Sequence, residues 1–249
     1  MSHPLPTIGL LHGWAMHGGL FDDLVAAWPE AEWRRLDLPG HGRQREKAWP
    51  ADTDALLDEV LGDLPRGSWL LGWSLGGLIA MQAALREPDR FAGLLLIAAT
   101  PSLIQRPHWP HGVEPAMLKA MAVELAGDPE TVVQRFLALE MHGAVNARSD
   151  LKRLRERAFQ HGYPARQALM AGLNHLAETD LTGQLSQLAL PVRLLGGRRD
   201  RLVPWAALEA VADAVPDGDL VRIPGAAHAP FLTDPEAVAA AVRGWSTDG

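Results

Sequence analysis

The pentapeptide Gly72-Trp73-Ser74-Leu75-Gly76 is the segment whose residue types and spacing most directly suggest chemistry. It matches the pattern G-x-S-x-G, and it stands directly after a short apolar run and directly before a segment with helical spacing. A sharp turn from strand to helix would lift the Ser74 hydroxyl above a sheet and aim the helix N-terminus at a developing oxyanion. The motif therefore predicts a nucleophilic serine. The alternative is a serine that only caps the helix.

A nucleophilic serine needs a general base, and the base needs an acid that orients it. His228 and Asp200 each follow an apolar, strand-like run, so both should lie beyond carboxyl ends of strands, where open α/β sheets place their sites. The chain order Ser, Asp, His is the one expected for a hydrolytic triad on such a sheet. Asp180 and Asp37 are rival acids, but neither ends a strand just upstream of the His228 strand. The structural alternatives are an Asp200 that pairs with a nearby arginine and a His228 that caps a turn.

The tripeptide His12-Gly13-Trp14 follows the first apolar run of the chain. A loop in this place can offer a backbone N–H to an oxyanion hole, and the residue after the nucleophile offers another. We therefore predict that the N–H groups of Trp14 and Leu75 form the hole. The alternative is that His12-Gly13 is only a turn.

The elements that must position these residues alternate along most of the chain. Apolar runs are followed by helical patterns, and the runs are apolar throughout, as expected for strands covered on both faces. This alternation predicts an α/β fold, with a doubly wound, mostly parallel sheet of about six strands flanked by helices. The expected strands are residues 7–11, 33–38, 69–71, 94–98, 192–195 and 220–223, and the first helices are residues 19–28, 51–64 and 75–85.

The alternation stops between about residues 101 and 190, where helical patterns follow one another without strands. We therefore predict a core of residues 1–102 and 186–249, with residues 103–185 inserted as a helical cap over one end of the sheet. The helices expected in this insertion are residues 115–126, 129–141, 146–161 and 165–177.

Composition narrows the class of protein. The 249 residues contain no cysteine, which removes disulfides, thiolate metal sites and a cysteine nucleophile. The net charge of −7 argues against a general nucleic-acid binder. The apolar runs are shorter than the roughly 18 residues of a membrane helix, and the first residues lack the features of a signal peptide. We therefore expect a cytoplasmic protein, and we expect it to be a monomer. The paired histidines lack acids at metal-ligand spacing, so no metal site is expected, and the proposed chemistry needs no organic cofactor.

Five segments together resemble the α/β-hydrolase superfamily over nearly the whole chain. They are Leu11-His12-Gly13-Trp14, Asp37-Leu38-Pro39-Gly40-His41-Gly42, Gly72-Trp73-Ser74-Leu75-Gly76-Gly77, Asp200 with Leu202-Val203-Pro204, and Ala227-His228-Ala229-Pro230-Phe231. More narrowly, the chain is similar to the family of biotin-pathway carboxylesterases that act on pimeloyl-acyl-carrier-protein methyl ester. The narrower resemblance rests on Trp14, on Trp73 and on two segments of the expected cap, residues 109–118 and 135–139.

This resemblance implies a serine esterase that cleaves a methyl ester while the acyl chain stays attached to a carrier protein. It also implies a substrate pocket formed, residue by residue, by Trp14, Leu75, Phe136, Leu137, Ala138, Leu139 and Glu140. Glu140 departs from the family pattern, which favours glutamine there. We further expect Trp73 and Phe231 to help wall a narrow acyl slot, with ordinary core packing as the alternative. Only six residues precede the first strand, so we expect the leading β-hairpin of the family to be missing or vestigial.

Basic residues gather in the expected cap. Residues 131–166 contain seven bases and three acids, so this stretch carries +4 and the rest of the chain −11. Because acyl carrier proteins are strongly acidic, we predict that a carrier docks on this stretch. The residues expected to bind it are Arg135, Arg148, Lys152 and Arg153. The alternative is an exposed helix face laced with salt bridges.

Two other functions are compatible with the same motifs. A generalist carboxylesterase or lactonase for short acyl esters would use the same three catalytic residues. A non-catalytic binding protein on a hydrolase fold is the other candidate, and the complete Ser74, Asp200 and His228 set argues against it.

Overall fold

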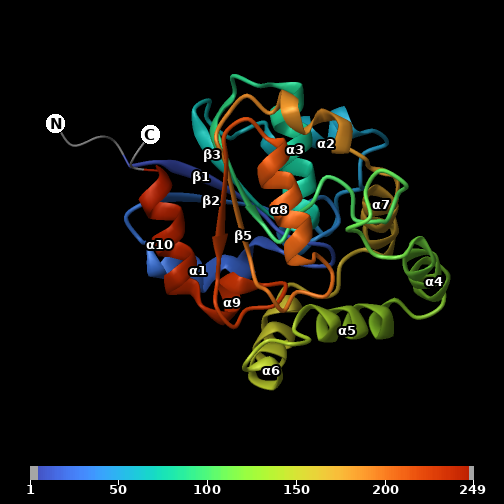
Figure 1. The fold of residues 1–249 in the computed structure, drawn as a ribbon. Coiled ribbons are helices and arrows are strands. Elements are labelled where there is room, and N and C mark those ends of the chain that lie inside the picture. The colour runs from blue at the N-terminus through green and yellow to red at the C-terminus, as the bar shows by residue number, and fades with distance from the viewer. Residues whose placement is uncertain (1–4, 247–249) are drawn as a thin grey trace.

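The computed structural model describes residues 5–246 and contains one sheet of six parallel strands (Figure 1). The order across the sheet is β2-β1-β3-β4-β5-β6. The strands are β1 (Thr7–Leu11), β2 (Glu32–Leu36), β3 (Ser68–Trp73), β4 (Phe91–Ile97), β5 (Val192–Gly196) and β6 (Gly218–Arg222). β1 pairs in parallel with both β2 and β3, from Ile8↔Trp33 and Ile8↔Trp69 onward, so β2 is added on one side of β1 and the later strands on the other. The expected sheet is confirmed.

The central strands are the most apolar ones, because helices cover both of their faces. Every residue of β3 is buried, and so is every residue of β4 except Ala92. The edge strands β2 and β6 carry charged residues and are partly exposed. β3 is longer than expected: Gly72 and Trp73 continue the ladder with Leu96 and Ile97.

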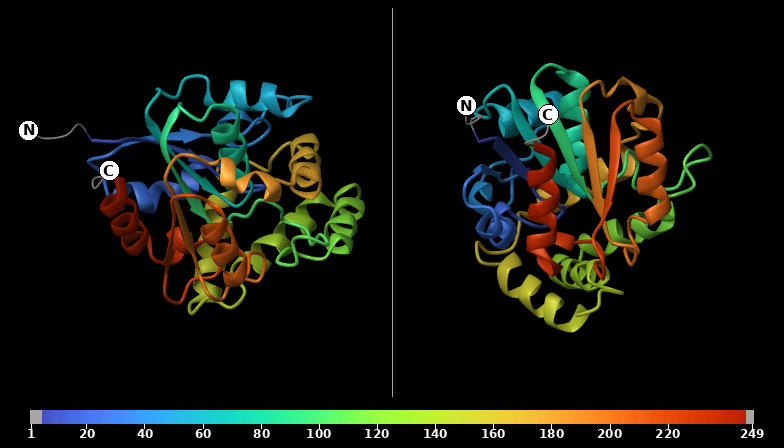
Figure 2. Two further views of the ribbon diagram at one scale, coloured as in Figure 1. Left: turned by 45° about the horizontal axis from the view of Figure 1, so that its top comes forward. Right: turned by 60° about the vertical axis from the view of Figure 1, so that its left-hand side comes forward.

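Helices pack on both faces of this sheet (Figure 2). The helices α1 (Asp22–Ala27) and α10 (Pro235–Ser246) pack against each other on one face, and α2 (Thr53–Leu61), α3 (Leu75–Arg86) and α8 (Trp205–Ala214) cover the other. The helix expected at residues 19–28 is divided: a 3₁₀ turn over Gly18–Phe21 precedes α1. The α2 helix begins after Asp52, whose carboxylate accepts a hydrogen bond from the Ala55 N–H and so caps the helix N-terminus.

Four helices lie between β4 and β5, as expected. They are α4 (Pro115–Leu125), α5 (Pro129–Glu140), α6 (Ala147–Ala158) and α7 (Arg166–Glu178), and they gather beyond the carboxyl ends of the strands (Figures 1 and 2). Proline occupies the first position of α4 and of α5, where its missing N–H costs no helical hydrogen bond. The guanidinium of Arg157 on α6 donates two hydrogen bonds of 2.7 and 2.8 Å to Asp23 on α1, which ties these helices to the rest of the fold.

The remaining elements are short. A 3₁₀ helix over Thr182–Gln187 leads into β5, and the four-residue helix α9 (Pro230–Thr233) follows the His228 loop. Of the helices that the structure describes, none has both the length and the apolar character needed to cross a membrane.

Candidate active site

Ser74 lies in a sharp turn between β3 and α3. Its backbone angles, φ 53° and ψ −115°, belong to a strained region that non-glycine residues seldom adopt. The turn is closed so tightly that the positions two residues before and two residues after Ser74 have no room for a side chain. A Cβ atom on Gly72 would lie 2.4 Å from the Gly76 carbonyl oxygen, and one on Gly76 would lie 2.3 Å from the Leu11 carbonyl oxygen. These two glycines therefore explain the G-x-S-x-G spacing in physical terms.

The structure brings Ser74, His228 and Asp200 together. The Nε2 atom of His228 lies 3.0 Å from the Ser74 hydroxyl oxygen, and its Nδ1 atom lies 2.7 Å from Asp200 Oδ2. Because a carboxylate oxygen can only accept, Nδ1 must carry the proton, and Nε2 is left free to accept one from Ser74. This is the geometry in which an imidazole can act as general base toward a serine hydroxyl.

The Asp200 carboxylate is held by the loop that follows β5. Its Oδ1 atom accepts hydrogen bonds from the N–H groups of Leu202 (2.8 Å) and Val203 (3.0 Å), which leaves Oδ2 directed at His228. The two rival acids are engaged elsewhere. Asp180 pairs with Arg106 and His108, and Asp37 accepts from two backbone N–H groups near the start of the chain.

The loop after β1 is fixed by a buried histidine. His12 donates from Nδ1 to the Gly13 carbonyl oxygen (2.8 Å) and accepts at Nε2 from the Leu38 N–H (2.9 Å), so it is neutral. Burial lowers the pKa of His12 to about 4, which agrees with this assignment. The loop therefore has a rigid support directly before Trp14. Within residues 5–246, the N–H groups of Trp14 and Leu75 donate to no turn, loop or cap hydrogen bond, so both are available to an oxyanion.

The side chain of Trp14 joins the sheet to the inserted helices. Its indole N–H donates a 2.8 Å hydrogen bond to the Leu169 carbonyl oxygen of α7, and its ring packs edge-on against Phe136 of α5, with centroids 5.0 Å apart. Trp73 and Phe231 are completely buried. Trp73 donates its indole N–H to the His228 carbonyl oxygen (2.9 Å), and Phe231 packs between Trp73 and Phe21. Trp73 therefore holds the His228 loop through its hydrogen bond, and Phe231 packs against Trp73.

The residues expected along the acyl path, 136–140, form the last turn and a half of α5, so their side chains diverge around the helix. Phe136 meets Trp14, and Leu137 is fully buried. Ala138 lines a hollow on the side of α6, Leu139 lines a groove on the side of α4, and Glu140 is fully buried beside the triad. The structure therefore divides this run among several environments.

A small cavity of about 10 Å³ opens at the Ser74 hydroxyl, room for about one water molecule. Several residues that line it were not among the residues proposed from the sequence: Leu78, Ala98, Ala99, Thr100, Leu103, Leu176 and Val203. The stretch from Ala98 to Leu103 follows the carboxyl end of β4, beside β3, so the placement rule that locates Asp200 and His228 could have found it. Leu176 comes from α7, and no local pattern connects it with Ser74.

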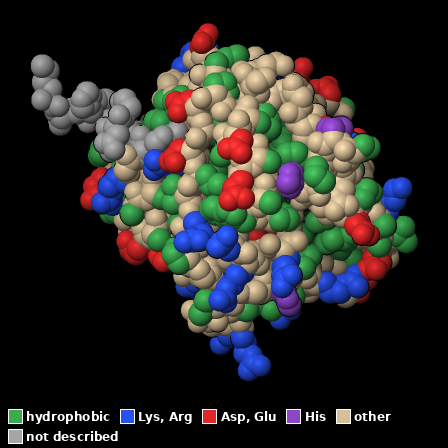
Figure 3. Space-filling view, viewed as in Figure 1, with side chains coloured by type: hydrophobic (Ala, Val, Ile, Leu, Met, Phe, Trp, Pro, Cys, Tyr) green, Lys and Arg blue, Asp and Glu red, His purple; other side chains and the backbone are tan. Residues whose placement is uncertain are grey.

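Lys and Arg side chains gather over the part of the surface formed by α5 and α6 (Figure 3). Arg148 and Lys152 point outward from α6; among the described residues Arg148 has no ion pair, and Lys152 only a 3.8 Å pair with Glu156. Arg135 pairs with Glu124 of α4. Arg153 turns inward, to Asp150 and the Leu232 carbonyl oxygen.

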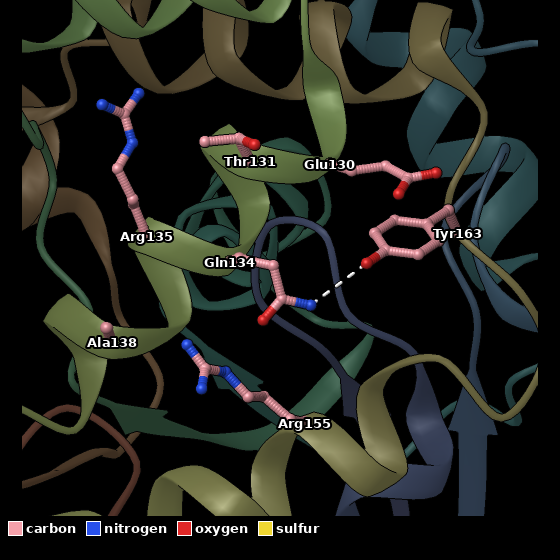
Figure 4. A pocket seen from close by; sticks show the side chains of 7 residues that line it. All are labelled: Glu130, Thr131, Gln134, Arg135, Ala138, Arg155 and Tyr163. Carbon is pink, nitrogen blue, oxygen red and sulfur yellow. Dashed lines mark hydrogen bonds between the residues drawn. The ribbon is translucent and has the colours of Figure 1, made fainter.

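Arg135 and Arg155 also flank a hollow of about 310 Å³ between α5 and α6, which Figure 4 shows from close by. The amide of Gln134 donates a 3.1 Å hydrogen bond to the Tyr163 hydroxyl across this hollow. Arg155 was not singled out from the sequence as a binding residue, although the count of bases in this stretch includes it. In the part of the chain that the structure describes, no three histidine, cysteine or acidic side chains converge as a metal site.

Comparisons with known proteins agree with this geometry. Residues 10–241 match the model of the alpha/beta hydrolase family. The chain is 41% identical over 239 residues to the pimeloyl-[acyl-carrier protein] methyl ester esterase of Stenotrophomonas maltophilia, covering 96% of this chain and 92% of that protein. The esterase of the same name from Xanthomonas oryzae pv. oryzae is also 41% identical, with 96% and 94% covered.

Solved structures share the fold at low sequence identity. The esterase EaEST from Exiguobacterium antarcticum superposes with a TM-score of 0.84 at 18% identity, covering 97% of this chain and 92% of that chain. The bromoperoxidase from Bacillus anthracis gives 0.85 at 19% identity, with 98% and 92% covered. At such low sequence identities, these structures show only that the fold is shared. The sequence matches go further: the chain belongs to the alpha/beta hydrolase family and, within it, to the family of the pimeloyl-[acyl-carrier protein] methyl ester esterases.

Proposed function

We propose that this protein is a serine carboxylesterase that hydrolyses the methyl ester of a pimeloyl chain carried by an acyl carrier protein, in biotin biosynthesis. The observation that carries the proposal is the hydrogen-bonded series Ser74–His228–Asp200, with separations of 3.0 and 2.7 Å, in a chain 41% identical to esterases of that name. The relatives match almost end to end, so the similarity includes the inserted helices as well as the sheet.

In the proposed mechanism, the Ser74 hydroxyl oxygen attacks the ester carbonyl carbon while His228 Nε2 takes the hydroxyl proton. Asp200 keeps the imidazole in the required tautomer and stabilises the imidazolium. The N–H groups of Trp14 and Leu75 bind the oxyanion. The C–O bond to the methoxy group then breaks, and His228 returns the proton so that methanol leaves. Water attacks the acyl-enzyme by the same route and releases the free carboxylic acid.

We propose that residues 103–185 act as a cap. The α7 helix covers the nucleophile: the backbone at Gly172 approaches the side chains of both Trp14 and Leu75, and Leu176 closes the cavity at Ser74. A space of about 10 Å³ is far too small for an acyl chain, so we propose that the cap and the loops around Ser74 open when the substrate enters.

The pathway assignment has a direct genetic test. The gene for this protein should restore growth, without added biotin, to a strain that lacks its own esterase of this step, and the Ser74→Ala variant should not. Failure of the native protein to restore growth, when it is folded and cleaves small esters, would replace the proposal by the generalist carboxylesterase or lactonase. Relative kcat/KM for carrier-bound and free methyl esters gives the same distinction in vitro.

We propose that the carrier protein docks on the α5–α6 surface through Arg148 and Lys152, with Arg135 and Arg155 at the rim of the hollow between the helices. The first two are exposed and weakly engaged, so they can meet an acidic partner without breaking a strong ion pair. Arg135 already pairs with Glu124, and Arg153 is held inward by the Leu232 carbonyl oxygen. Both residues should therefore contribute less to carrier binding than Arg148 and Lys152.

Reversing the charges of Arg148 and Lys152 to glutamate should raise KM for a carrier-bound ester about tenfold at low salt, because rim charges steer association. The KM and kcat for a small aryl ester should not change. The control for net charge is the double reversal of Arg34 and Arg66, which changes the net charge equally but lies on β2 and on the turn before β3, where these side chains pair with Glu32 and Glu87. Equal effects of both double variants on the carrier-bound substrate would contradict docking at α6.

A further inference from the structure

The carboxyl group of Glu140 is completely buried, and neither of its oxygens has a hydrogen-bond partner among the described residues. Glu140 is the last residue of α5, and its backbone carbonyl accepts a 3.1 Å hydrogen bond from the N–H of His228. A buried polar group without a partner costs free energy, and a buried unpaired charge costs far more. The protonation state of this side chain is therefore important for the stability of the site.

Three features of its surroundings disfavour the carboxylate form. Burial is the strongest and the nearby Asp200 carboxylate is the second, and together they raise the pKa of Glu140 well above its usual range. The third is the C-terminus of α5, where unsatisfied carbonyl groups make a negative charge unfavourable. No counterion compensates, because the side chain of Glu140 forms no ion pair within residues 5–246.

The titratable groups around Glu140 come from several elements. The loop after β5 contributes Asp200 and Arg199, and Arg199 is exposed and donates to the Gly143 carbonyl oxygen (3.2 Å) instead. The loop before α9 contributes His228, whose imidazole is engaged by Asp200 and Ser74. His142, two residues after Glu140, is exposed. On the helices packed against α5, Glu124 of α4 pairs with Arg135, and Arg155 of α6 lines the hollow beside Ala138. The buried Asp150 of α6 pairs with Arg153.

The end of α5 also bridges the two loops that carry the acid and the base. Beyond the bond to His228, the N–H of Val145 donates to the Gly225 carbonyl oxygen (3.1 Å). With the bond from Arg199 to Gly143, the segment 140–145 is tied to both loops. A change in the charge of Glu140 would therefore disturb the positions of Asp200 and His228 directly.

We propose that Glu140 is a neutral carboxylic acid in the active enzyme and serves as a positioning residue for the triad. In this form it keeps the end of α5 against the His228 loop and leaves the negative charge beside the imidazole to Asp200. Ionisation at high pH would draw water to the end of α5, pull it from the loop and break the bond to the His228 N–H. The positioning role depends on the proposed esterase mechanism, whereas the protonation state does not.

The sign of the pH effect follows from proton linkage. In the unfolded chain Glu140 loses its proton near the ordinary value of 4.5, while the folded protein retains it to higher pH. Between these two values the folded state binds more protons, so its stability falls as the pH rises. Replacing Glu140 by an uncharged residue removes that loss. Within this window each pH unit should therefore change the ratio of wild-type to variant unfolding constants about tenfold.

The test is urea unfolding of the wild type, Glu140→Gln and Glu140→Leu between pH 5 and pH 9, together with the pH profile of kcat/KM for a small aryl ester. Both variants should gain stability relative to the wild type as the pH rises, and in Glu140→Gln the alkaline fall in kcat/KM should move to higher pH. The matched control is Glu178→Gln, which changes the last residue of α7, an exposed glutamate, and should show a pH-independent difference.

A stability difference that stays constant from pH 5 to pH 9 would overturn the neutral acid. A kcat/KM profile of Glu140→Gln that coincides with the wild type would overturn the positioning role. The unfolding measurement needs no activity, so it separates failure of this inference from failure of the proposed esterase function.

Discussion

Ser74→Ala is expected to lower kcat for any ester by about 10⁴-fold or more, because no other group can form the acyl-enzyme that the proposed mechanism requires. The residual rate should be the part supplied by oxyanion binding and substrate positioning. Hydrolysis of an aryl ester measures the loss. Labelling by a fluorophosphonate gives an independent readout, with modification of the wild type and none of the variant.

The control for Ser74 is Ser149→Ala, which removes an exposed hydroxyl from α6 that bonds only the Asn146 carbonyl oxygen in the described residues. It should keep both activity and labelling. A wild-type protein that no fluorophosphonate modifies would favour the non-catalytic binding protein. Substantial activity left in Ser74→Ala would mean that another group is the nucleophile.

Asp200→Asn is expected to lower kcat by about 10⁴-fold while the fold is retained. The reason lies in the loop after β5, where Oδ1 of Asp200 accepts from the N–H groups of both Leu202 and Val203. An asparagine must present its carbonyl oxygen to those two donors, so its NH₂ group faces His228 Nδ1. The imidazole is then held with its proton on Nε2, directed at Ser74, and cannot act as a base.

Asp180→Asn provides the matched control for this change. Asp180 is the rival acid in the sequence, but its carboxylate bonds Thr182 and pairs with Arg106 and His108, away from the imidazole. Its amide variant should therefore keep kcat within a few-fold of the wild type. If the two variants lost activity equally, or if Asp200→Asn stayed active, the orienting role of Asp200 would be wrong. Circular dichroism of each variant verifies that the fold is intact.

The proposed catalytic residues could be predicted because each has a local signal in the chain. Ser74 stands between glycines that a tight turn requires, and Asp200 and His228 follow apolar strands. The strands of a parallel sheet all end at one edge, so residues that follow different strands come together without any knowledge of their contacts. The same regularity made the sheet predictable, since burial on both faces demands continuous apolar runs. The prediction of six strands and the family assignment are both confirmed.

The residues that surround Ser74, His228 and Asp200 could not be predicted from such local signals. Phe136 to Glu140 are consecutive in the chain, but a helix turns about 100° per residue and sends them to different neighbours. The sequence predicts that Trp73 and Phe231 wall the acyl slot, and the structure shows that Trp73 bonds the His228 carbonyl oxygen and packs against Phe231. Leu176 reaches the nucleophile from a helix about a hundred residues further along the chain. Such contacts depend on how the inserted helices pack, and no short sequence pattern predicts this packing.

The sequence by itself predicted the parallel sheet of about six strands and the three residues at its carboxyl edge, because apolar periodicity and turn geometry act over a few neighbouring residues. It also revealed that Glu140 is an acid where glutamine is favoured in the family. Only the tertiary structure decided the environment of the Glu140 carboxyl group. It packs the end of α5 against the loops of Asp200 and His228, buries the carboxyl group and provides no counterion. Charge in a folded protein depends on burial and on neighbours distant in the chain, and both are properties of the packed molecule.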